Sequence, residues 1–376
     1  MLTDNLTFSL IELIGMAVLA VGMLIQLVYL ISLTSLIFRK KPGASSTGKP
    51  SVSIIITARN YAEELRESLP LLLEQNYPDY EVVVVDDCST DHTDSVLRVM
   101  KHKYPQLKTT IVKQETDFAN ALALTVGIRA ATNDWLIFLD PQVVVPGSGW
   151  LDAYSAYLEP GKDIVFGYVN YSRTSGYGRW WTRIENFTLA LRYGPAWFFG
   201  LPMPISNINL AYRRKYFLEK RGFAAQLDTP FGENEMFVNK LSRKSNSAVA
   251  FDSATSVGIS GPLMYYDWMN LKKKHLLLRR KFSVSQRLYL SLDTVSRILT
   301  DVTLLILLVI SPYRFWVLGI WAFRFFVEFL LMIAASKHLG DKGLVLRSFL
   351  YRTCLPLING WMSWRQRIAA ERKKWK

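Results

Sequence analysis

The chain of 376 residues has only two cysteines, Cys88 and Cys354, and they lie far apart in the sequence. No disulfide framework is therefore expected. Most of the chain also lacks an excess of either charge. Residues 1–270 hold 25 Lys and Arg against 26 Asp and Glu, whereas residues 271–376 hold 20 against 5. The excess of positive residues behind the net charge of +14 thus lies in the part of the chain that flanks apolar segments, which favours contact with anionic lipid. No nucleic-acid partner is expected, because such a module carries a basic face within its own fold.

Charge is absent between Glu12 and Arg39, where Leu, Ile, Val, Met and Ala dominate. This run exceeds the roughly 20 residues that a spanning helix needs. A cleaved signal peptide is disfavoured, because the run is too long and no basic region precedes it. Basic residues follow at once, so residues 1–45 are predicted to form a transmembrane helix and linker, with the N-terminus outside and the following domain in the cytoplasm.

Two further apolar stretches, Leu290–Ser311 and Phe315–Ala335, are separated by a short turn. We predict that both span the membrane within residues 283–340, which gives three spanning helices in all. Residues 341–376 contain the less apolar segment Leu344–Trp364, which is predicted to lie on the membrane surface, followed by a basic cytoplasmic tail.

Residues 46–282 alternate short β-branched runs with amphipathic stretches, which predicts an α/β domain with a mostly parallel sheet. The clearest strand is Val82–Val85, a continuous apolar run typical of a strand buried on both faces. It ends at Asp86 and Asp87. Ligands of open α/β sheets bind outside the carboxyl ends of the strands, so these carboxylates are predicted to contact a ligand. The alternative is that they only cap the next helix.

The stretches SVSIIITARN, LLLEQNYPDYEVVVVDDCSTDHT and WLIFLD occur in an order and spacing that resemble the family 2 glycosyltransferases with the GT-A fold. Asn209-Leu-Ala-Tyr-Arg213 and Gly232-Glu-Asn-Glu-Met-Phe-Val-Asn239 resemble later motifs of a bacterial, membrane-anchored branch. The resemblance covers about residues 51–282. It implies an inverting enzyme of the bacterial inner (cytoplasmic) membrane, which moves a sugar from a nucleotide-diphosphate sugar donor to a lipid-linked or cell-surface glycan acceptor.

The resemblance also implies which residues bind the donor. The nucleoside pocket would be lined by Thr57, Ala58, Arg59, Asp86 and Asp87. Phe118-Ala-Asn-Ala121 stands where relatives carry His-Gly-Lys-Lys, and Asn120 is the member of this stretch assigned to the donor. Near the end of the domain, relatives close a Gln/Arg-rich motif over the diphosphate. Here the cations in that region are Lys272, Lys273 and Lys274, which would neutralise phosphate as point charges.

A divalent metal, Mg²⁺ or Mn²⁺, is implied on the diphosphate, and the family's D-x-D motif appears here as Asp140-Pro141-Gln142. Both Asp140 and Gln142 are assigned to the metal, although a neutral amide binds it more weakly than a carboxylate. Glu233 matches the catalytic base, and Asn209 and Glu235 are assigned to the acceptor.

The missing carboxylate leaves a second hypothesis open. In this alternative the chain is a catalytically weakened relative that binds nucleotide or glycan, or scaffolds a partner enzyme.

Overall fold

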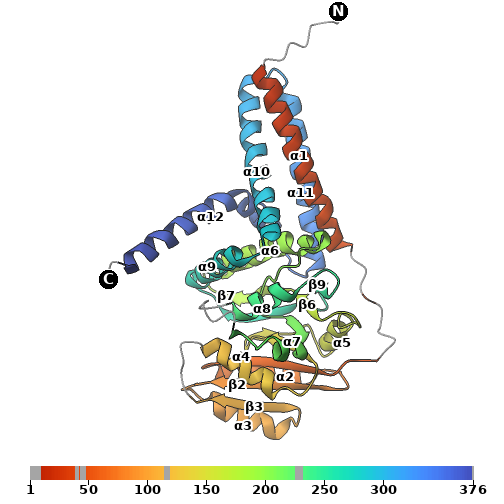
Figure 1. Cartoon of the computed structure of the whole chain (residues 1–376), viewed down its shortest axis with the longest axis vertical. Helices are drawn as coiled ribbons and strands as arrows, with labels where there is room; N and C mark the ends of the chain where they lie inside the picture. Colours follow the sequence, from red (N-terminus) through yellow and green to blue (C-terminus); the bar gives the residue numbers. More distant parts are fainter. Residues whose placement is uncertain (1–9, 39–41, 43–47, 114–118, 225–231, 375–376) are drawn as a thin grey trace, which may run out of the picture.

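The computed structural model describes residues 10–38, 42, 48–113, 119–224 and 232–374. It places long helices at one end, an α/β domain at the other, and helices α6 and α9 across the junction between them (Figure 1). The described helices are α1 (Leu10–Ile37), α2 (Ala62–Leu73), α3 (Thr93–Lys103), α4 (Ala119–Ala130), α5 (Trp150–Ser155), α6 (Arg179–Ala196), α7 (Arg214–Glu219), α8 (Glu233–Leu241), α9 (Tyr265–Lys281), α10 (Val284–Ile310), α11 (Arg314–His338) and α12 (Val345–Lys374), with a 3₁₀ turn η1 (Trp197–Phe199).

The domain is built on a sheet whose described strands run in the order β3-β2-β1-β4-β8-β6-β9. The first four are parallel to one another, and β8 runs antiparallel to both of its neighbours. The strands of this sheet are β1 (Val52–Ala58), β2 (Tyr80–Asp87), β3 (Leu107–Val112), β4 (Trp135–Leu139), β6 (Ile164–Gly167), β8 (Leu210–Arg213) and β9 (Ser247–Ala250). A smaller sheet contains β5 (Val143–Val144), β7 (Val169–Ser175) and β10 (Val257–Pro262).

The β-branched runs form strands because both of their faces are covered by helices. Ile55 and Val83 point into the core shared with α4, α6 and α8, whereas their neighbours Ile54 and Val82 point into the core shared with α2, α3 and α5. Val82 to Val85 have no exposed surface. The predicted α/β class with a mostly parallel sheet is confirmed, and the parallel strands β1, β2 and β4 end along one edge of the sheet.

Helices α1, α10 and α11 pack together beyond the junction (Figure 1). Glycine lets α1 approach α10 closely, since a Cβ at Gly22 would lie 2.4 Å from Thr300 Oγ1. Among the described helices, α1 and α11 are long and apolar enough to cross a membrane. The predicted third span, α10, falls outside this group because acids and arginines interrupt its apolar face. Helix α12 leaves the base of the three helices and runs to one side of them (Figure 1).

Candidate active site

The carboxyl ends of β1 and β2 bring most of the predicted donor residues together. The strands are parallel neighbours in register, with Ala58 beside Asp86, so Thr57 and Arg59 lie next to the carboxylate pair. Asp86 and Asp87 are both buried. The backbone N–H of Ser89 donates to Asp86 Oδ1 at 3.0 Å. The two predicted segments therefore form one polar edge of the sheet, although paired residues are 28 positions apart in the sequence.

The loops that follow these two strands are bonded to each other. Asn60 and Cys88 both adopt left-handed backbone conformations, with φ of 60° and 59°. The backbone N–H of Thr90 donates to Asn60 Oδ1 at 2.8 Å, and the backbone N–H of Asn60 donates to Ser89 Oγ at 3.0 Å. Asp91 accepts a further bond from the N–H of Ala62 at 3.1 Å. These bonds hold the two loops together at the polar edge of the sheet.

The predicted metal residues lie just beyond β4. Asp140 Oδ1 accepts the backbone N–H of Gln142 at 2.9 Å, and Gln142 Nε2 lies 3.5 Å from Glu64 Oε1 on α2. Burial raises the pKa of the half-buried Asp140 carboxyl; the Gln142 N–H opposes this shift and the negative charge of Glu64 adds to it. Glu64 was not predicted. The signal in the sequence is its place in the first turn after a strand end, where side chains face the ligand edge.

The predicted base is held by another predicted residue. Glu233 opens α8, and the preceding Gly232 has φ of 84°, a conformation that favours glycine. Asn120 Nδ2 donates to Glu233 Oε2 at 3.0 Å, across 113 residues of sequence. Glu233 is buried and Asn120 is exposed at the start of α4. The base thus has a neutral partner, while Phe118 of the same motif lies outside the described residues.

The three predicted phosphate lysines occupy different environments. Consecutive residues of a helix point about 100° apart, so the run on α9 is divided among several neighbours. Lys272 is buried and its Nζ lies 2.9 Å from Glu185 Oε2 on α6. Lys274 forms an ion pair with the buried Glu235. Lys273 is exposed and is the member of the run whose position most easily admits a ligand phosphate.

The Glu185 carboxylate is held by more than its lysine. Burial acts to raise the pKa of Glu185, but Lys272 and bonds from His275 and Tyr351 outweigh it and lower this pKa to about 2. Two further ion pairs tie the same helix α6 to the elements beyond it. Arg183 lies 2.7 Å from Asp341, and Arg192 lies 3.1 Å from Asp293 on α10.

Asn209 has a structural position. Its side chain has no exposed surface, and Nδ2 donates to the carbonyl oxygens of Tyr168 and Thr255, each at 2.9 Å. A Cβ at Gly167 would lie 2.4 Å from its amide carbon, so the glycine makes room for this side chain. Asn209 therefore joins strands in this structure and presents no surface to an acceptor.

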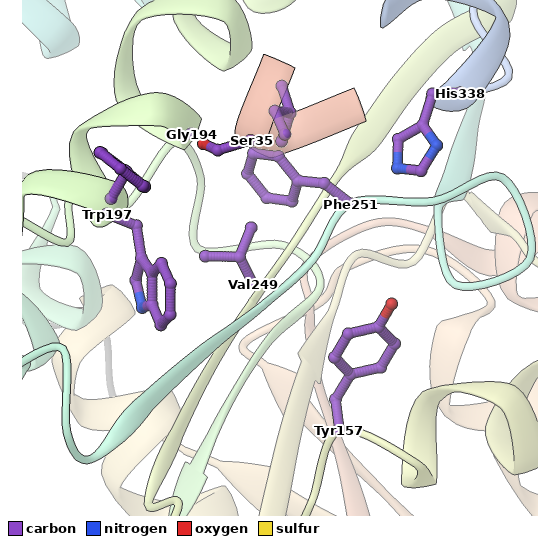
Figure 2. A pocket seen from close by; sticks show the side chains of 9 residues that line it. Ser35, Tyr157, Gly194, Trp197, Val249, Phe251 and His338 are labelled. Atoms are coloured by element: carbon purple, nitrogen blue, oxygen red, sulfur yellow. The ribbon is translucent and has the colours of Figure 1, made fainter. Parts of the chain in front are cut away.

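A separate cavity of about 210 Å³ lies where α1 and α11 reach the domain. Figure 2 shows Trp197, Val249 and Phe251 along it, with the Tyr157 hydroxyl turned toward the side of His338. That hydroxyl donates to Asp252 Oδ2 at 2.8 Å. None of the predicted site residues lines this cavity. It is thus distinct from the polar edge at the strand ends.

Comparisons with known proteins agree with the sequence motifs. Residues 53–219 match the family model described as Glycosyl transferase family 2. The amylovoran biosynthesis glycosyltransferase AmsB of Erwinia amylovora is 38% identical over 90 residues, which are 24% of this chain and 30% of that protein. Glycosyltransferase AglE of Haloferax volcanii is 34% identical over 142 residues, which are 37% of this chain and 45% of that protein. The chain thus spans less than half the length of these relatives.

One solved structure resembles nearly the whole chain. The mannosyltransferase PcManGT from Pyrobaculum calidifontis, in complex with GDP-Man and Mn²⁺, superposes with a TM-score of 0.54. The identity is 21%, and the match covers 89% of this chain and 100% of that one. This likeness establishes the GT-A fold.

Proposed function

We propose that the chain is a family 2 glycosyltransferase that transfers a sugar from a nucleotide-diphosphate sugar to an acceptor hydroxyl, starting from the match of residues 53–219 to that family's model. Residues 46–282 are the catalytic domain in this proposal. Two observed groups carry it. One is the buried carboxylate pair at the end of β2, and the other is Glu233, held by Asn120.

Each group has a defined chemical task. The crevice beside Asp86 and Asp87 receives the nucleoside, and Glu233 accepts the proton of the acceptor hydroxyl while its oxygen attacks the anomeric carbon. The nucleoside diphosphate leaves from the opposite side of that carbon, so the configuration inverts. Asn120 keeps the Glu233 carboxylate in place without neutralising it, and a base must keep its charge to accept a proton.

A divalent metal fits the residues that follow β4. Asp140 and Gln142 present hard oxygen donors, the ligand type that Mg²⁺ and Mn²⁺ prefer. Gly261, with φ of 95°, leaves space beside Gln142, since a Cβ there would lie 2.9 Å from Gln142 Nε2. When bound, the metal neutralises the charge that develops on the leaving diphosphate. The PcManGT structure, which holds GDP-Man and Mn²⁺, supports this choice of donor class and ion.

The proposal also includes anchoring of the chain in a membrane by its long helices. Helices α1 and α11 have the length and composition of spanning helices, and α10 packs with them as a third. Residues 1–45 would supply the first span, residues 283–340 the other two, and residues 341–376 a surface helix with a basic tail. The catalytic domain would face the cytoplasm at the cytoplasmic membrane, where a lipid-linked or glycan acceptor reaches the crevice.

Labelling tests this orientation. Pro312 lies between α10 and α11 at the end of the bundle farthest from the domain. A membrane-impermeant maleimide should label Pro312→Cys on intact cells, and the parent chain should stay unlabelled. Labelling that requires permeabilised cells would contradict the model.

A second candidate function rests on two observations. Gln142 stands where relatives carry a carboxylate, and Lys272 is bound to Glu185 instead of facing the crevice. Both differences reduce the number of groups that can bind the donor diphosphate. This is expected of a relative that binds a nucleotide or a partner without catalysing transfer. Full function in cells that carry Glu233→Gln with Asp140→Ala, combined with loss of function on deletion of residues 46–282, would favour this candidate.

The direct test of the enzyme is a panel of nucleotide sugars. The full chain in lipid nanodiscs is incubated with GDP- and UDP-sugars, with and without Mn²⁺, and with a membrane extract as the acceptor. We expect one donor to bind and to transfer labelled sugar to the extract. A chain that binds none of them would refute the proposal.

A further inference from the structure

We propose that Glu64, on the first turn of α2, supplies the second carboxylate of a divalent-metal site whose other protein ligands are Asp140 and Gln142. This inference rests on the proposed function, because the ion belongs to the diphosphate of the donor. The D-x-D pattern leads one to look for both carboxylates within three consecutive residues. The fold offers the second one from another element.

The placement of these three residues supports such a site. Gln142 lies between the two acids, because its backbone N–H donates to Asp140 Oδ1 at 2.9 Å and its side-chain Nε2 lies 3.5 Å from Glu64 Oε1. One residue therefore contacts carboxylates from two different elements, Asp140 through its backbone and Glu64 through its side chain. Gly261 on β10 leaves room for this arrangement, since a Cβ at that position would lie 2.9 Å from Gln142 Nε2.

The charge of the two carboxylates also favours a cation. Within the described ranges, no Lys, Arg or His forms an ion pair with Asp140 or Glu64. Two half-buried acids beside each other with no cation are costly, and a divalent ion relieves this repulsion.

The oxygen atoms of these residues are suitable ligands for such an ion. Mg²⁺ and Mn²⁺ are bound in phosphate-handling sites by one or two carboxylates together with substrate phosphates and water. Asp140 and Glu64 provide two carboxylates, and Gln142 adds an amide oxygen. The replacement of a D-x-D carboxylate by Gln142 is then compensated from α2. A carboxylate at position 142 would meet Glu64 at close range.

Glu63 offers a matched control on the same turn. It is exposed, and its carboxylate lies 3.6 Å from Arg66 on the surface of α2. Glu63→Gln removes the same charge from the same helix terminus without touching the crevice. Any effect of Glu64→Gln that exceeds this control comes from its position beside Asp140 and not from the helix dipole.

The test is a titration of Mn²⁺ with the full chain in nanodiscs, followed by the electron paramagnetic resonance signal of free Mn²⁺. We expect Glu64→Gln to weaken binding by about tenfold or more and Glu63→Gln to change it less than twofold. The double variant Glu64→Gln with Gln142→Asp should regain most of the affinity, because it again has two carboxylates. Equal binding by the two single variants, or no binding by the parent chain, would overturn the inference.

Folding is checked by thermal unfolding without metal. If Glu64→Gln does not fold, Gln142→Asp alone decides, since three carboxylates should bind Mn²⁺ more tightly than the parent, and unchanged or weaker binding would overturn the inference. Glu64-dependent Mn²⁺ binding in a chain that transfers no sugar would refute the proposed function alone. If the chain transfers sugar but its Mn²⁺ affinity is unchanged by Glu64→Gln, only this inference is refuted.

Discussion

The acids near the strand ends and the acids at the junction around α6 have partners of opposite kinds. Among the described residues of the candidate site, Glu233, Asp140 and Glu64 meet amides and a backbone N–H group, none of which carries a positive charge. At the junction, Glu185 meets Lys272 and Asp341 meets Arg183. An acid with a neutral partner can still receive a proton or a cation. An acid paired with a cation holds the structure together.

The junction extends this second pattern into the long helices. Asp293 lies 3.1 Å from both Arg192 and Arg297, and Glu328 lies 2.9 Å from Arg297 and 3.2 Å from Arg352. These pairs connect α6, α10, α11 and α12. The domain is therefore fastened to the helices by ion pairs in a setting where an unpaired charge is costly.

The largest expected effect tests the junction. Glu185→Leu leaves the buried Lys272 without its partner, which should destabilise the fold by about 3–5 kcal/mol. The double variant Glu185→Leu with Lys272→Met removes both charges and should recover most of that loss. Thermal unfolding in nanodiscs measures both. If Glu185→Leu is as stable as the parent, the Glu185–Lys272 pair does not stabilise the junction and the contrast with the candidate site fails.

The same pair predicts a dependence on pH. The pKa of Glu185 falls from its ordinary 4.5 to about 2 in the folded chain. Its contribution to stability is therefore fully present above pH 4.5 and is lost as the pH falls toward 2. Unfolding curves between pH 5 and pH 3 should show a smaller acid loss for the double Leu and Met variant than for the parent. Parallel curves would contradict this assignment.

The next effect concerns the crevice. Asp87→Ala removes a carboxylate from the predicted nucleoside pocket and should weaken nucleoside diphosphate binding by roughly tenfold to a hundredfold, the range of a lost bond to a charged group. Gln142→Ala should weaken it less, because a neutral ligand contributes less. Calorimetric titration with GDP and UDP measures both. Small and equal effects would show that the crevice does not bind nucleotide.

The smallest effect concerns Asn120. Asn120→Ala removes the bond that holds Glu233 and should lower the transfer rate by about threefold to tenfold, with donor binding unchanged. Asn120→Asp is the informative companion, since it places a like charge against the base and should lower the rate further. Steady-state kinetics measure the transfer rate and the apparent affinity for the donor separately. An unchanged rate in both variants would remove Asn120 from the site.

Local pattern was enough to predict the parts of the site that lie within one strand and its end. A continuous run of valines followed by two aspartates indicated both the buried strand and the polar edge, and the structure has both. The α/β class followed from the alternation of such runs with amphipathic stretches. These features depend on neighbours in sequence, so the sequence carries them.

The remaining parts depend on contacts between distant segments. Lys272 reads as one member of a basic cluster, but its partner Glu185 is 87 residues away on another helix. Asn120 and Glu233 were each predicted, yet their contact appears only in the fold. Glu64 was missed for the same reason. The orientation of a residue on its helix and its contacts in the tertiary structure determine whether its charge is paired. Neither can be predicted from a local sequence pattern.

The most direct test compares two acids that are two residues apart on α8. Glu233 has a neutral partner and Glu235 has Lys274, so the account assigns proton transfer to the first and structure to the second. The transfer rate of Glu233→Gln and Glu235→Gln is measured in the same nanodiscs at saturating donor. We predict that Glu233→Gln loses a factor of about a hundred to ten thousand in rate and still binds donor, while Glu235→Gln mainly lowers the unfolding temperature. A Glu233→Gln chain that transfers sugar as fast as the parent would contradict the account.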